Sequence, residues 1–398
     1  MTVRVITGDC REALRTLPDE SAHCVVTSPP YWGLRDYQIE PSIWGGDPAC
    51  DHAWGGGLRR HKGGPAGNGV MLAGGRSVVK AQDGVRDIAA GSFCAHCGAW
   101  RGCHGLEPSY QLYIEHAIEI FREVRRVLRA DGTLWLNLGD SYATRPYGDR
   151  HTFDPKYNGR QRAAGYPNRS FAHDLKHKDM CGIPWRVALA LQADGWWLRQ
   201  DVIWHKPNPM PESVADRCTK AHEYLFLLSK SDRYYFDAKA IAEPASGNTH
   251  QRTASKPSPS AVPGASSHSG LHKNTRTPGV GPKSAAEGTA VRAKESFHAS
   301  TAEVLATRNK RSVWTVQTAP FPEAHFATFP PALIEPCILA GCPQGGVVLD
   351  PFGGAGTTGL VADRLQRSAI LIELNPGYAE MARRRIERDA PLFQSAAE

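Results

Sequence analysis

The sequence predicts an α/β protein built on a doubly wound, mostly parallel sheet. Short apolar runs alternate along the chain with segments of helical periodicity, which is the pattern of strands joined by crossover helices. Two of these runs end in turns that no regular element can continue, one with paired prolines and the other rich in glycine. Hydrophobic residues make up 41% of the 398 residues, which is enough for one large α/β domain with an insertion or a second small module.

Periodicity places the individual elements. A polar helix is expected to start after Asp9, a further helix to run from Pro184 to Gly195, and another to start near Pro376. The longest predicted helix is expected to end at Gly132, because the apolar residues before it are three and four apart: Ile114, Ala117, Ile118, Phe121, Val124 and Leu128. Apolar runs predict strands at 3–6, 23–26, 133–138, 201–204, 224–228, 347–350 and 369–372.

A rigid polar turn, Thr-Ser-Pro-Pro-Tyr-Trp at residues 27–32, follows one of these strands. Two consecutive prolines have a fixed φ and no N–H, so the carbonyls of Ser28 and Pro29 cannot enter a regular helix and remain acceptors. Together with the Ser28 hydroxyl they can hold an amino group, while Tyr31 or Trp32 stacks on the ring that carries it. The turn therefore suits an aromatic exocyclic amine, although most Pro-Pro pairs are ordinary turns.

A glycine-rich strand-to-helix turn, residues 351–359, follows the strand that ends at Asp350. It lacks the Gly-Lys-Ser/Thr ending of a phosphate-binding loop and the spacing of the dinucleotide fingerprint, which disfavours a nucleoside triphosphate. An acidic strand tip suits a cationic or amino-bearing ligand instead. Glu373 ends the next strand, where a carboxylate commonly accepts hydrogen bonds from ribose hydroxyls. The alternative for Glu373 is a structural cap on the helix near Pro376.

Four soft or borderline metal ligands occur in two close pairs, Cys50-x-His52 and Cys94-x2-Cys97. The spacing resembles that of a zinc ribbon, with a stretch between the pairs that can fold back. Between residues 55 and 91, eleven of the 37 residues are glycine, which predicts a flexible excursion without packed elements. The sequence therefore predicts a structural Zn²⁺ beside the active turn.

Other interpretations of the cysteines stay open. Cys94 and Cys97 could form a redox pair, although the flanking thioredoxin-like pattern is missing, or the thiols could simply be scattered in a loop. Cys103 and His104 are spare candidates for the ligand set. The first residues lead directly into a strand without a signal-peptide pattern, and no stretch could span a bilayer, so we expect a cytoplasmic protein without a membrane partner.

Positive charge is concentrated in one segment. The net charge is +7, and residues 245–312 alone hold ten Lys/Arg against three Glu. This segment is rich in Ser, Pro and Gly and too poor in apolar residues to build a core. We expect a basic, flexible, DNA-contacting insert, and the alternative is a simple linker.

With the turn at residues 27–32 first and the glycine loop at residues 351–359 last, the chain resembles the beta class of amino-methylating DNA methyltransferases, which use S-adenosyl-L-methionine. The resemblance extends through Gly8-Asp9-Cys10, the central segments 112–142 and 183–236, and His325–Pro330, and it covers about two thirds of the chain. It implies a Rossmann-like methyltransferase fold.

The resemblance also implies roles for individual residues. Ser28, Pro29 and Pro30 would hold the target amine, and Tyr31 would stack on the base that carries it. Asp9 would meet the adenine ring of the cofactor. The remaining cofactor-binding residues would be Phe326 at its methionine end, together with Asp350, Phe352, Gly354, Gly356, Thr357 and Glu373.

The implied reaction is direct methyl transfer to an exocyclic amine of a base flipped out of double-stranded DNA. Ser rather than Asp at the first motif position favours cytosine N4, with adenine N6 as the alternative. Methylation of a ring carbon would require a Pro-Cys nucleophile, which the turn at residues 27–32 does not contain. An RNA or protein amine, or an idle zinc-containing DNA-binding protein, is less favoured. A cognate restriction enzyme is a candidate partner, and the oligomeric state is left open.

Five segments are expected to follow one another along the chain. Residues 1–48 form the first part of the methyltransferase core with the catalytic turn, and residues 49–105 the glycine-rich insertion with the zinc site. Residues 106–244 return to the strands and helices of the core. The basic insert occupies residues 245–312, and residues 313–398 form the cofactor-binding part of the core.

Overall fold

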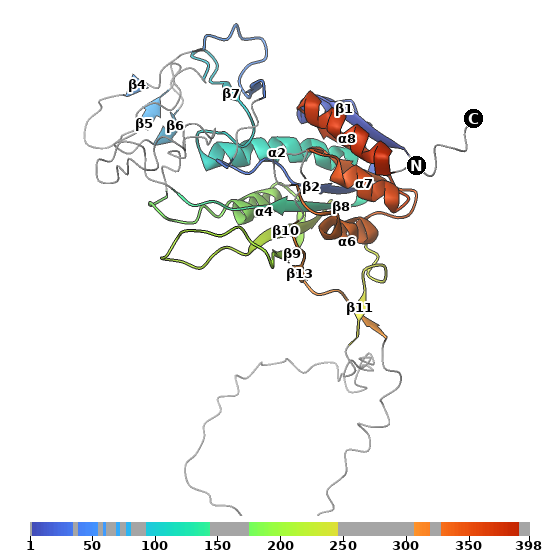
Figure 1. Ribbon diagram of the computed structural model, residues 1–398. Helices are drawn as coiled ribbons and strands as arrows, with labels where there is room; N and C mark the ends of the chain where they lie inside the picture. Colours follow the sequence, from blue (N-terminus) through green and yellow to red (C-terminus); the bar gives the residue numbers. More distant parts are fainter. Residues whose placement is uncertain are drawn as a thin grey trace, which may run out of the picture. The chain divides into compact units, whose positions relative to one another are not determined.

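The computed structural model describes residues 2–34, 39–54, 93–143, 175–245, 306–318 and 328–389, together with the backbone of three short strands within 59–80. The chain forms two compact units, which we describe separately (Figure 1). The first unit holds residues 1–241 and 311–398, and the second holds residues 242–310. No helix among the described residues is long and apolar enough to cross a membrane.

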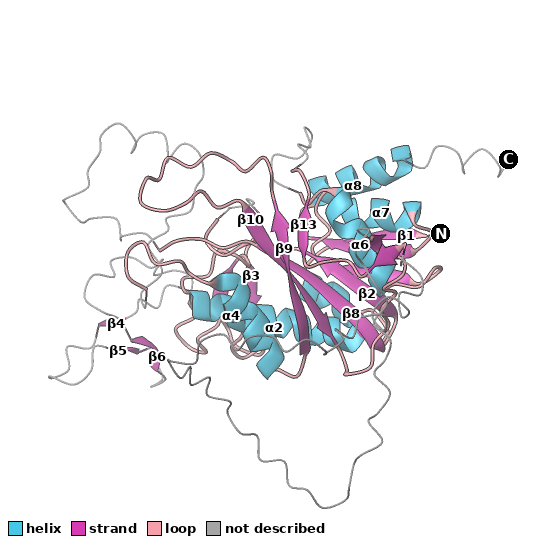
Figure 2. Cartoon of the chain, turned by 90° about the horizontal axis from the view of Figure 1, so that it is seen from below, coloured by secondary structure: helices cyan, strands magenta, loops and turns pink. Residues whose placement is uncertain are grey.

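The first unit is built on an eight-stranded sheet in the order β1-β15-β14-β2-β8-β10-β9-β13. Strands β2, β8, β9 and β10 of this sheet are labelled in Figure 2. The paired strands run parallel except at β10, which is antiparallel to both neighbours. All seven predicted strands are present, and β13 is added at one edge. Their bounds are β1 Val3–Thr7, β2 Ala22–Thr27, β8 Leu128–Leu138, β9 Trp197–His205, β10 His222–Ser229, β13 Val313–Thr315, β14 Val347–Asp350 and β15 Ser368–Glu373.

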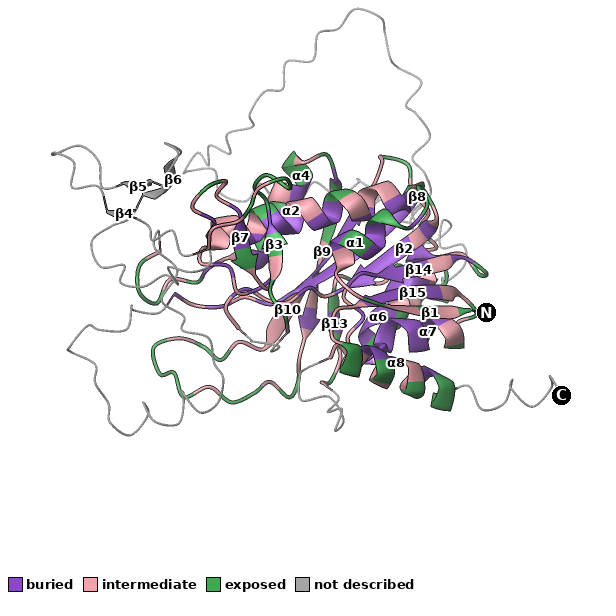
Figure 3. Cartoon of the chain, turned by 90° about the horizontal axis from the view of Figure 1, so that it is seen from above, coloured by how far each residue is buried: buried purple, intermediate pink, exposed green. Residues whose placement is uncertain are grey.

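Helices cover both faces of this sheet, which confirms the doubly wound prediction (Figure 3). One layer contains α1 Cys10–Arg15, α2 Tyr110–Val127 and α4 Ile183–Ala193, and the other contains α6 Pro331–Gly341, α7 Thr357–Arg364 and α8 Pro376–Asp389. Each layer encloses its own core cluster. Successive residues of β2 alternate between the two clusters, with Val25 in the first and Cys24 and Val26 in the second, as the period of a strand requires. A strand with both faces buried has to be apolar throughout.

The predicted end of the longest helix was wrong. Helix α2 ends at Val127, because Leu128 is already extended at φ −72° and ψ 135°, and β8 begins at once. Gly132 therefore lies inside a strand. A Cβ on Gly132 would come within 2.5 Å of the Leu128 side chain and 3.0 Å of the His23 carbonyl oxygen, so close approach of the backbone requires this glycine.

The segment between the two metal-ligand pairs contains regular structure that the sequence did not predict. Strands β4 Arg59–Arg60, β5 Gly69–Met71 and β6 Ser77–Lys80 form a small antiparallel sheet. Beside it in the sequence, β3 Ser42–Trp44 pairs antiparallel with β7 Trp100–Gly102.

The second unit contains one described antiparallel pair, β11 Glu243–Pro244 with β12 Thr307–Arg308. The predicted basic insert falls almost wholly on residues 246–305, which lie outside the described residues.

Candidate active site

The carboxyl ends of the parallel strands bring the two sequence motifs together. Strand β14 pairs with β2, so the last residues of both strands reach the same edge of the sheet. There the Thr27 hydroxyl donates a hydrogen bond of 2.6 Å to Asp350 Oδ1. The proline turn that follows Thr27 and the glycine loop that follows Asp350 therefore start side by side, although 323 residues separate them.

Asp350 organises the start of the glycine loop. Its carboxylate is buried and accepts hydrogen bonds from the hydroxyls of Thr27 and Thr358, each at 2.6 Å, and from the Phe352 N–H at 3.0 Å. Burial raises the pKa of Asp350, and these three donors oppose the shift. Because protein donors already occupy both oxygens, Asp350 supports a ligand by fixing the loop rather than by offering free acceptors.

Glu373 holds the glycine loop from the neighbouring strand. Its Oε2 accepts from the Gly354 N–H and its Oε1 from the Asn375 N–H, both at 2.8 Å. Burial raises the pKa of this carboxyl, whereas the two backbone donors lower it. The alternative role expected for Glu373, capping the helix near Pro376, is filled by Asn375. The Asn375 Oδ1 accepts a hydrogen bond from the Gly377 N–H at the start of α8.

Two glycines of the loop are required by the geometry. Gly354 and Gly356 have φ values of +49° and +79°, which side chains rarely adopt. A Cβ on Gly356 would also lie 2.8 Å from the Cβ of Ala382 in α8. Gly354 therefore remains partly exposed next to the buried carboxylate of Asp350, whereas Gly356 is buried against α8, and Thr357 follows directly as the first residue of α7.

Asp9 lies at the next strand tip. The N–H of Gly8 donates to the Glu373 carbonyl oxygen at 2.9 Å, which joins β1 to β15 at this edge. Asp9 caps α1 by accepting from the Arg11 N–H at 2.9 Å, and it also binds the Arg11 guanidinium at 2.8 Å and the Ser42 hydroxyl at 2.8 Å. Burial raises the pKa of Asp9, but Arg11 outweighs this and holds it below its ordinary value. Phe326, the expected contact at the methionine end of the cofactor, lies outside the described residues.

The turn at residues 28–31 is fixed from several sides. The Ser28 hydroxyl lies 3.3 Å from Tyr31 Oη, which in turn lies 2.8 Å from Glu223 Oε2 and 3.0 Å from Asn137 Oδ1. A Cβ on Gly139 would come within 2.4 Å of the Tyr31 ring, so that glycine lets the ring lie against the backbone of the strand end. The tyrosine is therefore held by its hydroxyl at one end and by close packing along its ring.

The prediction of Trp32 as an alternative residue for stacking on the base was wrong. It is buried, its indole N–H donates to the Glu107 carbonyl oxygen at 3.0 Å, and its ring meets Tyr110 edge-on. Pro30 is equally restrained, since its carbonyl accepts from the Tyr113 hydroxyl at 2.9 Å. Of the two aromatic residues, only Tyr31 remains partly exposed at the site.

Glu223, Asn137 and Lys206 are site residues that the sequence did not single out. Glu223 accepts hydrogen bonds from Tyr31 and from the side-chain amide of Asn137, and forms an ion pair with Lys206. The sequence did contain a signal for Glu223, which is a charged residue at the start of an otherwise apolar strand. Its meaning depends on β10 being antiparallel, since only then does the start of β10 lie where β2 and β8 end.

A second buried carboxylate supports the turn from behind. Glu107 is 1% exposed; its Oε1 binds Nδ1 of His104 at 2.8 Å and Nδ1 of His116 at 3.0 Å, and its Oε2 accepts from the Gly105 N–H at 2.8 Å. Burial raises the pKa of Glu107, but the two histidines lower it to about 2. A Cβ on Gly105 would lie 2.9 Å from Pro30 Cβ, so this cluster sits directly against the proline pair.

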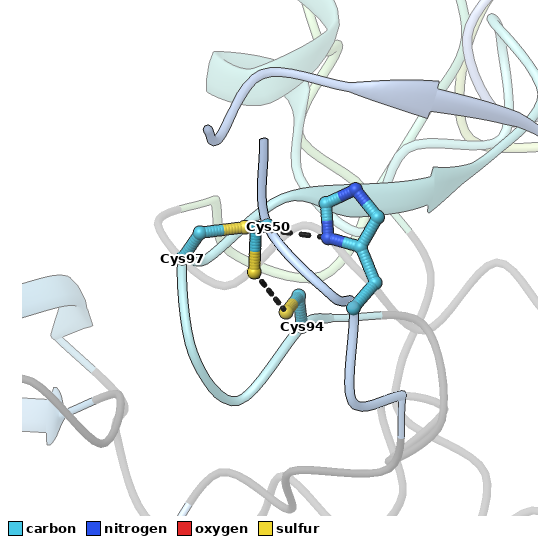
Figure 4. Close-up of side chains that lie close together, drawn as sticks. Cys50, Cys94 and Cys97 are labelled. Carbon is cyan, nitrogen blue, oxygen red and sulfur yellow. Dashed lines mark hydrogen bonds between the residues drawn. The ribbon is translucent and has the colours of Figure 1, made fainter. Parts of the chain in front are cut away.

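The four predicted metal ligands come together, and Figure 4 labels the three cysteines among them. The sulfurs of Cys50 and Cys94 are 3.9 Å apart, the Cys97 sulfur is 3.4 Å from His52 Nδ1, and all four ligand atoms lie within 4.8 Å of one another. A tetrahedron with bonds of about 2.3 Å has edges of about 3.8 Å, which matches these separations. The spare candidates Cys103 and His104 are not part of this group.

The local backbone and charges also fit a cation. The His96 N–H lies 3.4 Å from the Cys94 sulfur, the geometry of a metal-binding turn. Desolvation raises the pKa of Cys94, but backbone N–H groups and His52 bring it down to about 5, whereas desolvation and the neighbouring thiols raise that of Cys50 to about 12. Thiols this close cannot all ionise without a positive charge between them.

The fold and this edge of the sheet define a methyltransferase of the kind that modifies amino groups. An acidic strand tip and a glycine loop lie beside a proline turn that carries a hydroxyl and an aromatic ring. The chain belongs to the DNA methylase family of N6- and N4-amino-methyltransferases, whose family model matches residues 22–384. Enzymes of this family transfer the methyl group of S-adenosyl-L-methionine to DNA.

Individual relatives match over nearly the whole chain. The type II methyltransferase M.SmaI of Serratia marcescens is 37% identical over 385 residues, which cover 97% of this chain and 91% of that protein. M.Cfr9I of Citrobacter freundii is 36% identical over 392 residues, covering 98% and 90%. Among solved structures, the cytosine-N4-specific PvuII DNA methyltransferase aligns with a TM-score of 0.48 and 15% identity, covering 97% of this chain and 89% of that chain.

Proposed function

We propose that the protein methylates the N4 amino group of cytosine in double-stranded DNA, at a specific site and after base flipping. The observation that carries this proposal is the Thr27–Asp350 hydrogen bond of 2.6 Å, because it sets the amine-holding turn beside the loop expected to hold the cofactor. Ser28 rather than Asp in that turn favours cytosine. Adenine N6 is the second candidate, since a hydroxyl and a carbonyl accept either amino group.

The residues of the turn position the amine. Ser28 Oγ and the Pro29 carbonyl accept its N–H groups, so the nitrogen lone pair is directed toward the methyl donor. Tyr31 stacks on the flipped ring. When bound, S-adenosyl-L-methionine supplies an electrophilic methyl group on a sulfonium. Catalysis by the protein is then mainly alignment together with exclusion of water.

The proposed cofactor site lies at the carboxyl ends of three neighbouring strands. Asp9, Asp350 and Glu373 end or directly follow β1, β14 and β15, and their carboxylates shape the backbone that a ligand would meet. Glu373 suits the ribose hydroxyls, because a carboxylate can accept about four hydrogen bonds and the two backbone N–H donors use only part of that capacity. The partly exposed Gly354 has no side chain, so a ligand can approach its backbone closely. Phe352 lies in the same loop and Thr357 directly follows it. Phe326 is proposed to contact the methionine end of the cofactor.

We also propose a structural Zn²⁺ held by Cys50, His52, Cys94 and Cys97. The match between their separations and the edges of a tetrahedron supports it. Four protein ligands leave no open position, so the metal would stabilise the insertion rather than take part in methyl transfer. The remaining partners are proposed from the sequence: DNA contacted by the basic insert, and a cognate restriction enzyme.

Nucleoside analysis tests the target base. DNA from cells expressing the protein is digested to nucleosides and analysed by mass spectrometry, with Ser28→Ala as the inactive variant and Ser21→Ala as the matched control. We expect N4-methylcytosine with the wild type and the control, and its loss with Ser28→Ala. N6-methyladenine alone would replace the proposed target by the second candidate, and unmodified DNA would refute the activity.

A further inference from the structure

A continuous line of hydrogen-bonding groups leads away from the amine-holding turn. It starts at the Ser28 hydroxyl, passes through Tyr31 Oη at 3.3 Å, and ends at Glu223 Oε2, a further 2.8 Å away. The three groups come from two separate segments, the turn after β2 and the start of strand β10. Two hydroxyls that can each both donate and accept thus connect the proposed amine site to a carboxylate that can accept a proton.

The far end of this line is held in place. Glu223 is largely buried, with its side chain 18% exposed, and it forms an ion pair with Lys206, whose side chain is 17% exposed. The Asn137 amide donates to Glu223 Oε2 at 3.3 Å and to the Tyr224 carbonyl oxygen at 3.1 Å. Because Asn137 is anchored by two acceptors, it fixes the orientation of the carboxylate that Tyr31 contacts.

Methylation of an amine creates a need for such an acceptor. As the nitrogen forms its bond to the methyl carbon, it gains positive charge and must lose a proton to give the neutral product. Ser28 alone is too weak a base to keep that proton. A carboxylate connected to Ser28 through one hydroxyl could accept it without contacting the base.

We propose that Glu223 accepts the proton released by the methylated amine through Tyr31 and Ser28, an inference that rests on the proposed DNA amine methylation. The C–S bond of the cofactor breaks with its electron pair left on sulfur, and the C–N bond forms from the nitrogen lone pair. The amine proton passes to Ser28 Oγ as the Ser28 hydroxyl proton passes to Tyr31 Oη, and the Tyr31 proton passes to Glu223. The product leaves neutral, and Glu223 later returns its proton to water.

The residues around Glu223 complement a carboxylate. Lys206 pairs with it directly, and Lys220 and His222 are close enough to interact with it electrostatically. Lys220 Nζ is buried without a hydrogen-bond partner among the described residues, and burial lowers its pKa. The Lys206 ammonium therefore holds the Glu223 carboxylate at the end of the line. Glu223 acts through Tyr31 and does not itself contact the base.

Single-turnover methyl transfer tests the relay. Glu223→Gln keeps the shape but cannot take a proton, and Tyr31→Phe keeps the stacking ring but interrupts the line. We expect each to slow transfer from labelled cofactor to DNA by about a hundredfold, with cofactor affinity retained. The double variant should be no slower than either single variant. Asp216→Asn, in an exposed ion pair of the same β9–β10 loop, is the control and should match the wild type.

The pH profile separates proton transfer from mere support of the tyrosine. Because a glutamine side chain cannot take up a proton, the pH dependence of the transfer rate should differ between Glu223→Gln and the wild type. A slowed variant with an unchanged pH profile, additive effects of the two substitutions, or a Tyr31→Phe rate equal to wild type would each overturn the relay. Wild-type methylation of adenine instead of cytosine would overturn only the target base, whereas the absence of any DNA methylation would overturn the proposed function and the relay together.

Discussion

Replacing Glu107 by glutamine tests how strongly the buried carboxylate supports the active turn. Its Oε1 receives the Nδ1 hydrogens of His104 and His116, and its Oε2 receives the Gly105 N–H, so both oxygens act only as acceptors. A glutamine must place an NH2 group against one of these donors. The variant therefore loses a buried charge and brings two donors face to face.

The pKa of Glu107 gives the size of the effect. Its fall from the ordinary 4.5 to about 2 corresponds to about 3 kcal/mol of unfolding free energy at neutral pH. Because the folded-state pKa is the lower one, this stability is fully present above about pH 5. It is lost as the pH falls through 4.5 toward 2, where the carboxylate becomes protonated in the folded protein as well.

Urea unfolding of the wild type and of Glu107→Gln at pH 7, 5 and 4 provides the assay. Comparing the two proteins at each pH cancels the titrating groups that lie away from Glu107, including the thiols of the Cys50, Cys94 and Cys97 cluster. Glu115→Gln serves as the control, since Glu115 is exposed on α2 next to His116. We expect Glu107→Gln to cost about 3 kcal/mol at pH 7 and less at pH 4, and the control to cost almost nothing. A cost below about 0.5 kcal/mol, or one that grows toward acid pH, would refute the reasoning.

Three further predictions concern the site. Ser28→Ala should leave cofactor binding near normal while abolishing turnover, whereas Asp350→Asn should weaken cofactor binding about tenfold. Calorimetry measures the binding and single-turnover assays measure the methyl transfer. Equal loss of both properties in both variants would contradict the division of roles. Gly139→Ala should slow methylation about tenfold with an unchanged melting temperature, because its Cβ would displace the stacking tyrosine ring; a wild-type rate would show that the ring position is unimportant. Purified protein should contain one zinc per chain by elemental analysis. Cys97→Ser should lose the zinc and melt at lower temperature, whereas Cys218→Ser, at an exposed cysteine, should keep it. Equal zinc content in both variants would contradict the ligand set.

Much of the fold could be predicted because local patterns determined it. The strands of the parallel sheet are buried on both faces, so each is a short apolar run that the sequence shows directly. The meeting of Thr27 and Asp350 follows once β14 pairs with β2, because residues at the carboxyl ends of neighbouring parallel strands share one edge. The four candidate metal ligands were chosen by their spacing alone, and the structure brings all four together.

The remaining features depend on three-dimensional contacts that no local pattern encodes. A glycine after a helical pattern is a common stop signal, so Gly132 was expected to end the helix. In the structure it lies inside β8, where the His23 backbone comes too close for a side chain. Tyr31 and Trp32 are adjacent aromatic residues, and only the packed structure shows which one is buried against Tyr110. Glu223 joined the site because β10 runs against its neighbours, a direction that an apolar run does not reveal.

A crystal structure of the protein with its DNA site and a non-reactive cofactor analogue would test the central claim most directly. The site itself can be read beforehand from the modified bases in cellular DNA. We predict a flipped cytosine whose N4 lies about 3 Å from Ser28 Oγ and the Pro29 carbonyl oxygen, with the analogue against the loop from Phe352 to Gly356. A base held away from the proline turn, or a cofactor bound elsewhere than at the tips of β14 and β15, would contradict it.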